Sequence, residues 1–268
     1  MSLVWEDHFD GDSLNASRWR VLEQVHRGGV YTKENVQVAD GVLTLITVPQ
    51  NMTIDQGGQP TNFYVSSGAV NTSGLFEQRH GRWEVRVKLP AVALSRGYTL
   101  HSSIWLFADA RNPTRTGCPQ EIDVVEQYTA GDSNVSNAVA NLHPFSGCSS
   151  AGHAAGCAHA VGSGTCAKVP YARPRTTTAR GDWTTDWTVF IVDWTESWIG
   201  MRVNGVPYAA FEPAAGNASA TAAFTDELFL ALTSCVMDRV PVGEADVFPL
   251  RYEIDYVKVY QYEFGSGQ

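Results

Sequence analysis

Three carboxylates in one short segment could carry out acid–base chemistry. Glu121, Asp123 and Glu126 lie in the run EIDVVE (121–126) and are separated only by isoleucine and valine. Such β-branched residues predict a buried strand. Acids on a buried strand are costly unless they are paired or used. The segment therefore indicates a working carboxylate pair with a helper; the alternative is a solvated cluster on the outer face of a sheet.

The spacing of the acids decides which face of the strand each one occupies. Glu121 and Asp123 are two residues apart, so they share a face. Glu126 is five residues from Glu121, and strict alternation would place it on the opposite face. One extra residue, a β-bulge at Val124-Val125, would return Glu126 to the face of Glu121. The two glutamates would then be spaced like residues four apart, with about 13 Å between their Cα atoms.

This arrangement predicts glycoside hydrolysis. If the two glutamate side chains lean together, their carboxyl groups come to about 5–6 Å, the separation that retaining glycosidases use. One glutamate would be the nucleophile and the other the acid/base. Asp123 could hydrogen-bond the nucleophile, and the like charges predict a raised pKa for the acid. In a competing interpretation the acids bind calcium, but the run lacks the glycine and the spacing of a known calcium loop.

The elements that must position these acids are short strands. Residues 82–89 alternate between polar and apolar side chains, and Pro90 ends that strand. Asn204-Gly205 is a strong hairpin turn. Many short strands with Gly, Pro and Asn between them indicate a sandwich or barrel. Further strands are expected at 42–48, 63–72, 102–107, 121–127, 137–143, 187–194, 198–203, 207–211, 228–234 and 251–261.

Composition excludes several classes of function. The chain has 268 residues, of which 44% are hydrophobic, and we expect one catalytic domain over 1–268. The formal net charge is −9 and no basic run occurs, which argues against nucleic acid and anionic membrane surfaces as partners. The sequence contains no run of about 18 apolar residues, so no transmembrane helix is predicted. Nothing at the start resembles a signal peptide, although one could have been removed. We expect a monomer.

Cysteines and glycosylation sequons point to a secreted protein. The cysteines lie at 118, 148, 157, 166 and 235, and Asn-x-Ser/Thr sequons begin at Asn15, Asn51, Asn71, Asn134 and Asn217. The cysteine spacing does not suit zinc. Residues 146–181 read as a long, cysteine-bearing surface loop, pinned by a disulfide, and a loop of that length is usually functional. Residues 264–268 read as a flexible tail.

Several segments together resemble glycoside hydrolase family 16, in its laminarinase-like branch. EIDVVE resembles the bulged, six-residue form of that family's active-site signature. The resemblance covers nearly the whole chain in the expected order. The other matching segments are WEDHFDG (5–11), DGVLTL (40–45), GRWEVRVKLP (81–90), Trp194 with the later Asn204-Gly205, and YEIDYVKVY (252–260).

The resemblance implies a fold, an activity and a set of site residues. The fold is an all-β jelly-roll sandwich of two antiparallel sheets with a concave substrate cleft. The implied enzyme is a retaining endo-glycosidase acting on β-1,3- or mixed β-1,3/1,4-glucan. Alternatives are another activity of the family, either a transglycosylase or an algal galactan hydrolase, or a catalytically silent carbohydrate-binding protein. Catalysis would need no cofactor.

The resemblance also assigns roles to individual residues. Glu121 would be the nucleophile, Asp123 its partner and Glu126 the acid/base. Contacts to a polysaccharide substrate are expected from Trp105, His143 and Trp194, and more weakly from Asn35, Glu84 and Arg86. A structural calcium ion would be held by the backbone oxygens of His8 and Gly41 and by the carboxylate of Asp255.

The sequence departs from the family pattern at several positions, among them His101 and the strand that carries Cys235. His101 stands where the family often has the first tryptophan of a Trp-Pro-Ala-x-Trp run, so one cleft tryptophan is replaced and a histidine takes its place near the substrate. Cys235 stands in a later strand, where it is similar to cysteines of fungal members. A disulfide between Cys118 and Cys235 would close the edge of the cleft, although sequence alone does not fix the pairing.

Overall fold

A computed structural model gives the fold of most of the chain. It describes residues 1–91, 99–108, 120–130, 137–146, 167–168, 179–180, 183–211, 224–243 and 248–263. For strand residues 129–130, 137–138, 143–146, 167–168, 179–180 and 211 only the backbone is described. The described elements are strands, apart from one short 3-10 helix, η1 (Lys33–Asn35).

One sheet contains eleven strands. Nine of them form a continuous path in the following order: β17 (Val206–Phe211), β16 (Ile199–Val203), β15 (Thr188–Trp194), β9 (Gly81–Lys88), β19 (Leu250–Gln261), β6 (Val42–Asp55), β7 (Pro60–Ser67), β4 (Gly29–Tyr31) and β3 (Gln24–His26). Two more strands pair off this path: β1 (Ser2–Asp7) with β19, and β5 (Val36–Ala39) with β6. Strands β4 and β7 pair in parallel, and the other described pairs are antiparallel.

The other sheet contains eight strands and carries the three acids. Seven of them form a path in the following order: β13 (Ala167–Lys168), β12 (Asn137–Ser146), β11 (Gln120–Ala130), β10 (Thr99–Phe107), β18 (Phe229–Val236), β8 (Ala69–Asn71) and β2 (Arg20–Val21). The eighth, β14 (Ala179–Arg180), pairs with β12. Glu121, Asp123 and Glu126 all lie on β11, next to the centre of this sheet.

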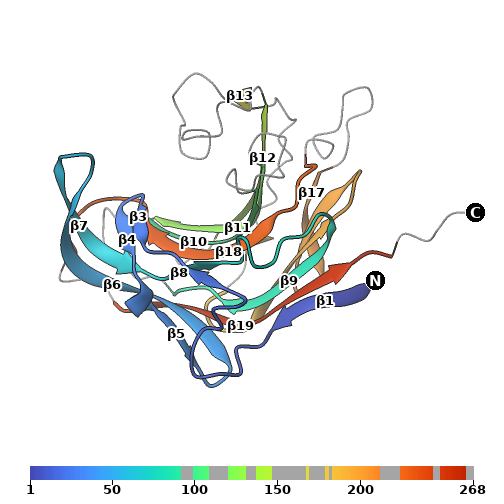
Figure 1. Cartoon of the computed structure of the whole chain (residues 1–268), viewed down its shortest axis with the longest axis horizontal. Coiled ribbons are helices and arrows are strands. Elements are labelled where there is room, and N and C mark those ends of the chain that lie inside the picture. Colours follow the sequence, from blue (N-terminus) through green and yellow to red (C-terminus); the bar gives the residue numbers. More distant parts are fainter. Residues whose placement is uncertain are drawn as a thin grey trace, which may run out of the picture.

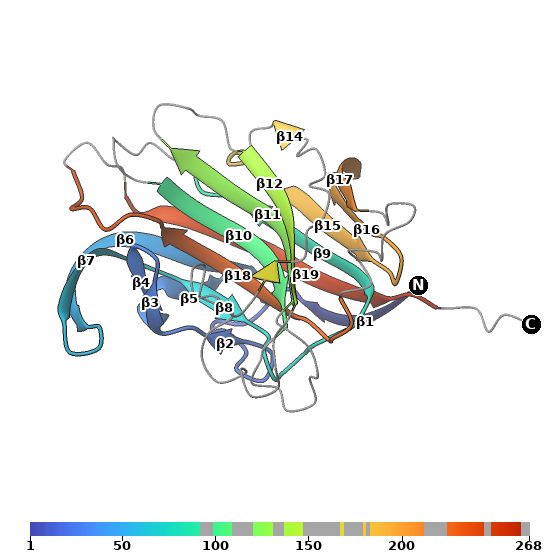
Figure 2. The same ribbon diagram turned by 90° about the horizontal axis from the view of Figure 1, so that it is seen from above.

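The two sheets stack face to face around one hydrophobic core. Figure 1 shows the eight-stranded sheet lying over the eleven-stranded sheet, and Figure 2 shows β10, β11 and β18 side by side from above. Ile104 and Ile122 enter the core from the eight-stranded sheet, while Val85, Phe190 and Ile254 enter it from the other. Strand β9 buries alternate residues against this core, and the outer face of the eight-stranded sheet, on the side away from the core, is left for the site. The predicted all-β sandwich of two sheets is confirmed.

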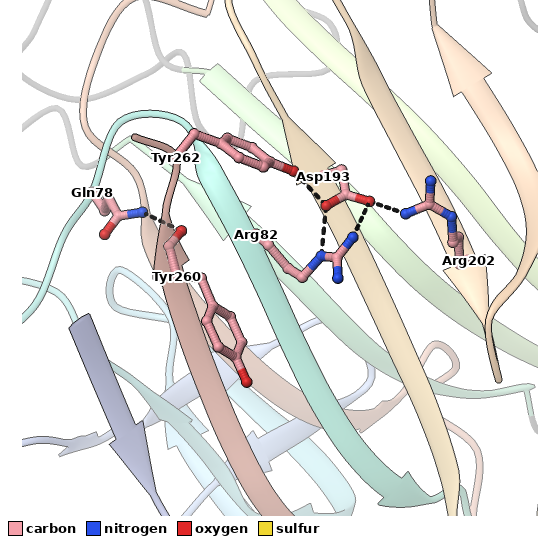
Figure 3. Close-up of polar contacts among 6 residues, drawn as sticks. All are labelled: Gln78, Arg82, Asp193, Arg202, Tyr260 and Tyr262. Atoms are coloured by element: carbon pink, nitrogen blue, oxygen red, sulfur yellow. Dashed lines mark hydrogen bonds and ion pairs between the residues drawn. The ribbon is translucent and has the colours of Figure 1, made fainter. Parts of the chain in front are cut away.

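The polar side of β9 shows how the outer face of the eleven-stranded sheet is organised. Arg82 and Arg202 both bind the buried carboxylate of Asp193, Arg82 through two bonds of 2.7 and 3.2 Å, and Tyr262 donates to the same carboxylate at 2.5 Å (Figure 3). Gln78 donates to the Tyr260 carbonyl oxygen at 3.3 Å beside this cluster. The cluster therefore joins β9, β15, β16 and the chain that follows β19.

Most strand predictions are confirmed, and two expectations about modification are corrected. Cys235 is a free, buried thiol, so its predicted disulfide with Cys118 is wrong; Cys118 lies outside the described residues. The predicted sequon at Asn71 lies on buried strand β8, and its side chain accepts a bond from the Ser73 backbone, so a folded chain has no room for a glycan there. Asn15 and Asn51 are exposed.

Two predicted segments fall largely outside the described residues. Of the expected loop 146–181, the structure describes the two short strands β13 and β14, each paired with β12. The expected tail, 264–268, is not among the described residues. Within the part of the chain that is described, no helix has the length and apolar character needed to span a membrane.

Candidate active site

A β-bulge at Val124 sets the geometry of the acid-bearing strand. On one side, Trp105 of β10 lies opposite Asp123, and the preceding Ile104 lies opposite Val125, which leaves Val124 without a partner on β10. The pairing with β12 shifts in the same place, between Asp123 and Glu126. Two residues of β11 therefore face one residue of each neighbour. The bulge that was predicted from the spacing of Glu121 and Glu126 is present.

The bulge brings the three acids to one face of the sheet. The register opposes them to alternate residues of β10: Glu121 to Phe107, Asp123 to Trp105 and Glu126 to Ser103. The intervening β10 residue Ile104 points into the core. Because directly opposed residues of antiparallel strands share a face, the acids all lie on the outer side of the eight-stranded sheet. Glu121 and Glu126 are spaced like residues four apart on β10, as predicted.

A buried tyrosine from the other sheet supports the bulge. Tyr208 of β17 is buried in the core and donates a hydrogen bond from its hydroxyl to the carbonyl oxygen of Val124. A bulge disturbs the ladder of backbone bonds, so a buried carbonyl there needs another donor. Tyr208 supplies that donor across the core.

Glu126 sits in a ring of hydrogen-bond donors. Its Oε1 lies 3.0 Å from Nε2 of His101 and accepts a bond of 2.6 Å from the Tyr128 hydroxyl. Its Oε2 accepts a bond from the side-chain amide of Asn141. Only 8% of the Glu126 residue surface is exposed. The carboxylate is therefore held in one orientation by three neighbouring strand residues.

These contacts correct the predicted direction of the pKa shift. Burial alone would raise the pKa of Glu126, but the hydrogen bonds from His101 and Tyr128, the charge of His101 and the bond from Asn141 outweigh it and lower the pKa to about 2. The sequence predicted a raised pKa from like-charged neighbours. The alternation of side chains along the strand identified the neighbouring acids. It did not identify the donors that stabilise the charged form of Glu126, which lie on other strands or further along β11.

The other two acids occupy the same face with different exposure. Glu121 is partly exposed, while Asp123 is buried, with 4% of its surface accessible. His143 lies opposite Glu121 in the register of β11 and β12, and Asn141 lies opposite Asp123. The backbone thus brings His143 beside Glu121, as predicted. The His143 side chain is not among those that the structure describes.

Trp105 and His101 lie four residues apart on β10, on the same face of the sheet as the three acids. Trp105 is partly exposed, and its indole nitrogen donates to the Thr233 hydroxyl at 3.3 Å. His101 is buried, with 6% of its surface exposed, and contacts Glu126. Trp105 can therefore still offer a ring face to a sugar, whereas His101 is an internal partner of an acid and not an open platform.

Two residues predicted to contact substrate are buried elsewhere. Trp194 has no exposed surface and packs in the core, because its position on β15 has the same parity as Val192. Asn35 is also buried, and its amide donates to Thr32 at 3.1 Å and to Ser66 at 2.7 Å. Both predictions are wrong: these side chains support the eleven-stranded sheet.

Glu84 and Arg86 are also wrongly predicted as substrate contacts, because they lie on the outer face of the opposite sheet. Their strand β9 belongs to the eleven-stranded sheet, and its buried residues face the shared core. Glu84 accepts a 2.7 Å bond from the Tyr256 hydroxyl, and Arg86 forms an ion pair with Asp255. The core separates both from the acids.

The residues expected to hold calcium are only partly suited to it. A Cβ on Gly41 would lie 3.9 Å from the carbonyl oxygen of His8, so these two backbone positions are neighbours. A surface hollow of about 590 Å³ lies beside them, lined by residues 10–12 and 38–41. The carboxylate of Asp255 is instead paired with Arg86. Among the described residues no cluster of three acidic, His or Cys side chains is placed to hold a metal. The calcium site stays a prediction.

Sequence reasoning missed the partners of Glu126. Tyr128 could have been found, because it lies two residues after Glu126 and shares its face once the bulge is placed. Asn141 comes from the neighbouring strand β12, and only the register identifies it. Tyr208 comes from the opposite sheet, and no local pattern in the sequence marks it.

Known proteins resemble this chain in sequence over different spans. No protein-family model matches it. The glucan endo-1,3-beta-glucosidase A1 of Niallia circulans is 26% identical over an alignment of 141 residues, which covers 47% of this chain and 20% of that protein. The clotting factor G alpha subunit of Tachypleus tridentatus is 24% identical over an alignment of 266 residues, which covers 97% of this chain and 34% of that protein. The chain thus spans about a third or less of these relatives.

A solved structure matches the architecture over almost the full length. SCLam, a non-specific endo-beta-1,3(4)-glucanase from family GH16, has a TM-score of 0.67 and is 26% identical, covering 97% of this chain and 94% of that chain. This chain has the fold of the family 16 glucanases. In this chain the bulged strand β11 lies inside the eight-stranded sheet, opposite the sheet that contains the first and last described strands, β1 and β19. The fold implied by the sequence motifs is confirmed.

Proposed function

We propose that the chain is a retaining endo-glycosidase that hydrolyses β-1,3- or mixed β-1,3/1,4-glucan. The observation that carries this proposal is the bulge at Val124, which puts Glu121, Asp123 and Glu126 on one outer face. The similarity to enzymes described as endo-1,3 and endo-1,3(4) glucanases supports the substrate class. The partly exposed ring of Trp105 on the same face suits stacking against a sugar.

In the first step Glu121 acts as nucleophile. Its carboxylate forms a bond to the anomeric carbon while the bond from that carbon to the glycosidic oxygen breaks, and Glu126 gives a proton to the leaving oxygen. Glu121 is the more exposed of the two glutamates, which suits direct attack. Asp123, between them on the same face, holds the position and charge of the nucleophile.

In the second step water releases the sugar from Glu121. The Glu126 carboxylate accepts a proton from the water, the water oxygen bonds to the anomeric carbon, and the bond to Glu121 breaks. Two inversions give net retention at the anomeric carbon. The bonds from Tyr128 and Asn141 keep the carboxylate of Glu126 aimed during both steps.

Activity on defined glucans tests the proposal. The purified chain should release oligosaccharides from laminarin or lichenan, and NMR of fresh products should show β-anomers first. Glu121→Gln should lower kcat by a factor of about 10⁴ or more, because no nucleophile remains. Glu34→Gln, an exposed glutamate on η1, is the matched control and should keep wild-type activity. Net inversion, or full activity of Glu121→Gln, would contradict the mechanism.

Chemical rescue separates the roles of the two glutamates. With azide, Glu126→Ala should form the β-glycosyl azide, because the covalent intermediate still forms and azide replaces the water. Glu121→Ala should form the α-glycosyl azide, because azide attacks the anomeric carbon directly. The opposite pattern would exchange the two assignments.

Two other functions remain to be separated from glucan hydrolysis. A screen with agarose, carrageenan and xyloglucan, with product sizing, detects a galactan hydrolase or a transglycosylase. A catalytically silent carbohydrate-binding protein is the other outcome. In that case laminarin would bind by calorimetry with equal affinity to wild type and Glu121→Gln, and no polysaccharide would be cleaved.

The proposal includes an extracellular place of action, as a monomer. A polysaccharide substrate, and exposed sequons at Asn15 and Asn51, support it. Expression in a secreting eukaryotic host followed by intact-mass measurement would detect glycans at these two asparagines, and an unmodified secreted chain would remove this support. Light scattering of the purified chain measures the oligomeric state.

A further inference from the structure

His101 lies between an active-site acid and a buried thiol. Its position on β10 is opposite Tyr128 on β11 and Cys235 on β18, so all three share the acid-bearing face. Nε2 of His101 lies 3.0 Å from Oε1 of Glu126, and Nδ1 lies 3.7 Å from Sγ of Cys235. The ring also packs against Tyr128 with centroids 4.7 Å apart. The imidazole is therefore fixed in place with one nitrogen aimed at Glu126.

Glu126 is poorly able to store the proton that its proposed role needs. Burial would raise its pKa, but the hydrogen bonds from His101, Tyr128 and Asn141, together with the charge of His101, lower it to about 2. A carboxyl group with that pKa is ionised at neutral pH, yet a general acid must deliver a proton. Burial and the neighbouring Glu126 charge raise the pKa of Tyr128, so the phenol keeps its own proton. His101 is the remaining titratable group in hydrogen-bond contact with Glu126 among the described residues.

We propose that His101 holds the proton that Glu126 delivers to the leaving oxygen, so that the two side chains act together as one acid. This inference rests on the proposed function, in which Glu126 is the acid/base. It makes His101 a positioning and proton-holding residue that acts through Glu126 and does not touch the sugar.

The proton balance closes over one catalytic cycle. Before the reaction His101 is an imidazolium, with one proton on Nε2 and one on Nδ1, and Glu126 is a carboxylate. The proton passes from Nε2 to Glu126 and then to the glycosidic oxygen, as the bond to the leaving sugar breaks and Glu121 bonds to the anomeric carbon. In the second step Glu126 takes a proton from water and returns it to His101. No other reactant is consumed.

The surroundings leave His101 and Glu126 as the pair that exchanges this proton. On the β18 side, burial raises the pKa of Cys235 to about 11, so the thiol stays neutral. From β4, Tyr31 packs in the same buried cluster as Cys235, and its pKa is raised by burial. Arg27 adds a positive charge near Cys235, and Asp123 adds a negative one near Tyr128. None of these neighbours offers a second proton at neutral pH.

The test is the pH dependence of His101→Gln against wild type. Glutamine keeps a hydrogen-bond donor for Glu126 but has no titratable proton to pass on. On laminarin, kcat at pH 7 should fall by about 10²-fold. The basic limb of the kcat/KM profile should move to lower pH by about one unit or more, because a carboxyl group alone loses its proton below the imidazole range. An equal loss at every pH would show a merely structural role and overturn the proposal.

A substrate that needs no acid gives an independent readout. With 2,4-dinitrophenyl β-laminaribioside the leaving phenolate departs without a proton, so His101→Gln should keep a kcat/KM within about threefold of wild type. A loss as large as that on laminarin would contradict the proposal. His80→Asn is the matched control, because His80 packs on Trp194 away from the acids and asparagine tolerates its positive φ of 63°.

A measurement without substrate separates failure of this inference from failure of the proposed function. In the ¹⁵N-histidine-labelled chain, NMR should follow the imidazole nitrogens of His101 through pH 4–9. Glu126→Gln should lower the pH at which they titrate, because the carboxylate that favours the charged ring is gone. An unchanged titration would refute the shared proton, even if the wild type cleaves laminarin. The expected shift would stand even if no glucan is cleaved.

Discussion

Tyr208 and Val124 come from different sheets, and they meet where the acid-bearing strand bulges. The tyrosine hydroxyl donates to the carbonyl of the extra residue, and the tyrosine side chain is buried. The bulge alone turns Glu126 from the core side to the side of Glu121. A hydrogen bond across the core therefore helps to decide which way the acid/base of the proposed reaction points.

Tyr208→Phe should weaken both the fold and catalysis. Removal of the hydroxyl leaves the buried Val124 carbonyl without its side-chain donor, which should cost about 1–3 kcal/mol in the free energy of unfolding. Because the bulge relaxes, kcat on laminarin should fall more than KM changes. Urea unfolding and steady-state kinetics measure the two effects. A stability loss with wild-type kcat would show that the bulge holds without the tyrosine.

Tyr252→Phe is the matched control for that substitution. Tyr252 is also a fully buried core tyrosine, and its hydroxyl has no hydrogen-bond partner among the described residues. Its removal should leave the unfolding free energy unchanged or slightly raised, because no bond is lost and a buried polar group is removed. Activity should stay at the wild-type level.

The geometry of strand β11 was predictable because it follows from the number of residues between its acids. The side-chain period of two and the spacing of Glu121 and Glu126 required a bulge, and β-branched neighbours required a buried strand. Both features are local to a few residues of sequence. The order of strands in the sheets, and the contact between Tyr208 and Val124, depend on pairings between distant segments that parity does not reveal.

The substrate contacts were harder to predict, because alternation does not say which face of a strand is the core. Trp105 and Trp194 both sit on predicted strands, yet one is partly exposed beside the acids and the other is buried. Glu84 and Arg86 are on the polar face of β9, as alternation indicated, but that face belongs to the other sheet. The assignment of strands to sheets decides such cases, and it is a property of the whole fold.

Asp193→Asn should destabilise the chain without affecting catalysis. Asp193 is buried and binds Arg82, Arg202 and Tyr262 on the face of the eleven-stranded sheet away from the acids (Figure 3). The arginine side chains are 28% and 29% exposed, so solvent screens part of the interaction. We expect a loss of about 1–3 kcal/mol in unfolding free energy, with kcat unchanged. A reduced kcat at full folding would contradict the separation of the two faces.

The stabilities of wild type and Asp193→Asn should depend differently on pH in the acid range. Burial would raise the pKa of Asp193, but the bonds from Arg82 and Tyr262 and the two arginine charges lower it. A lowered folded-state pKa means that the stabilisation is present above the unfolded-state pKa, near 3.9, and is lost as the pH falls through the folded-state value. The difference in Tm between wild type and Asp193→Asn should therefore be constant above pH 5 and shrink below about pH 4. A difference that grows in acid would contradict this sign.

Cys235 should resist thiol reagents until the chain unfolds. It has 1% of its surface exposed, and burial raises its pKa to about 11, so almost no thiolate is present at pH 7.5. Iodoacetamide under native conditions, followed by peptide mapping, should leave Cys235 unmodified, while labelling in guanidinium should be complete. A peptide that joins Cys235 to another cysteine, or fast native labelling, would contradict the buried free thiol.

Two tryptophan substitutions should separate substrate binding from core packing. Trp105 is partly exposed beside Asp123, so Trp105→Ala should raise KM for laminarin by about tenfold, a loss of about 1.4 kcal/mol in binding, with little change in Tm. Trp194 is fully buried in the core, so Trp194→Ala should cost about 3–5 kcal/mol of stability. Trp194→Phe should recover much of that stability with a wild-type KM. If Trp194→Phe instead raised KM as Trp105→Ala does, Trp194 would have to reach the substrate, which its burial in the core between the two sheets does not allow.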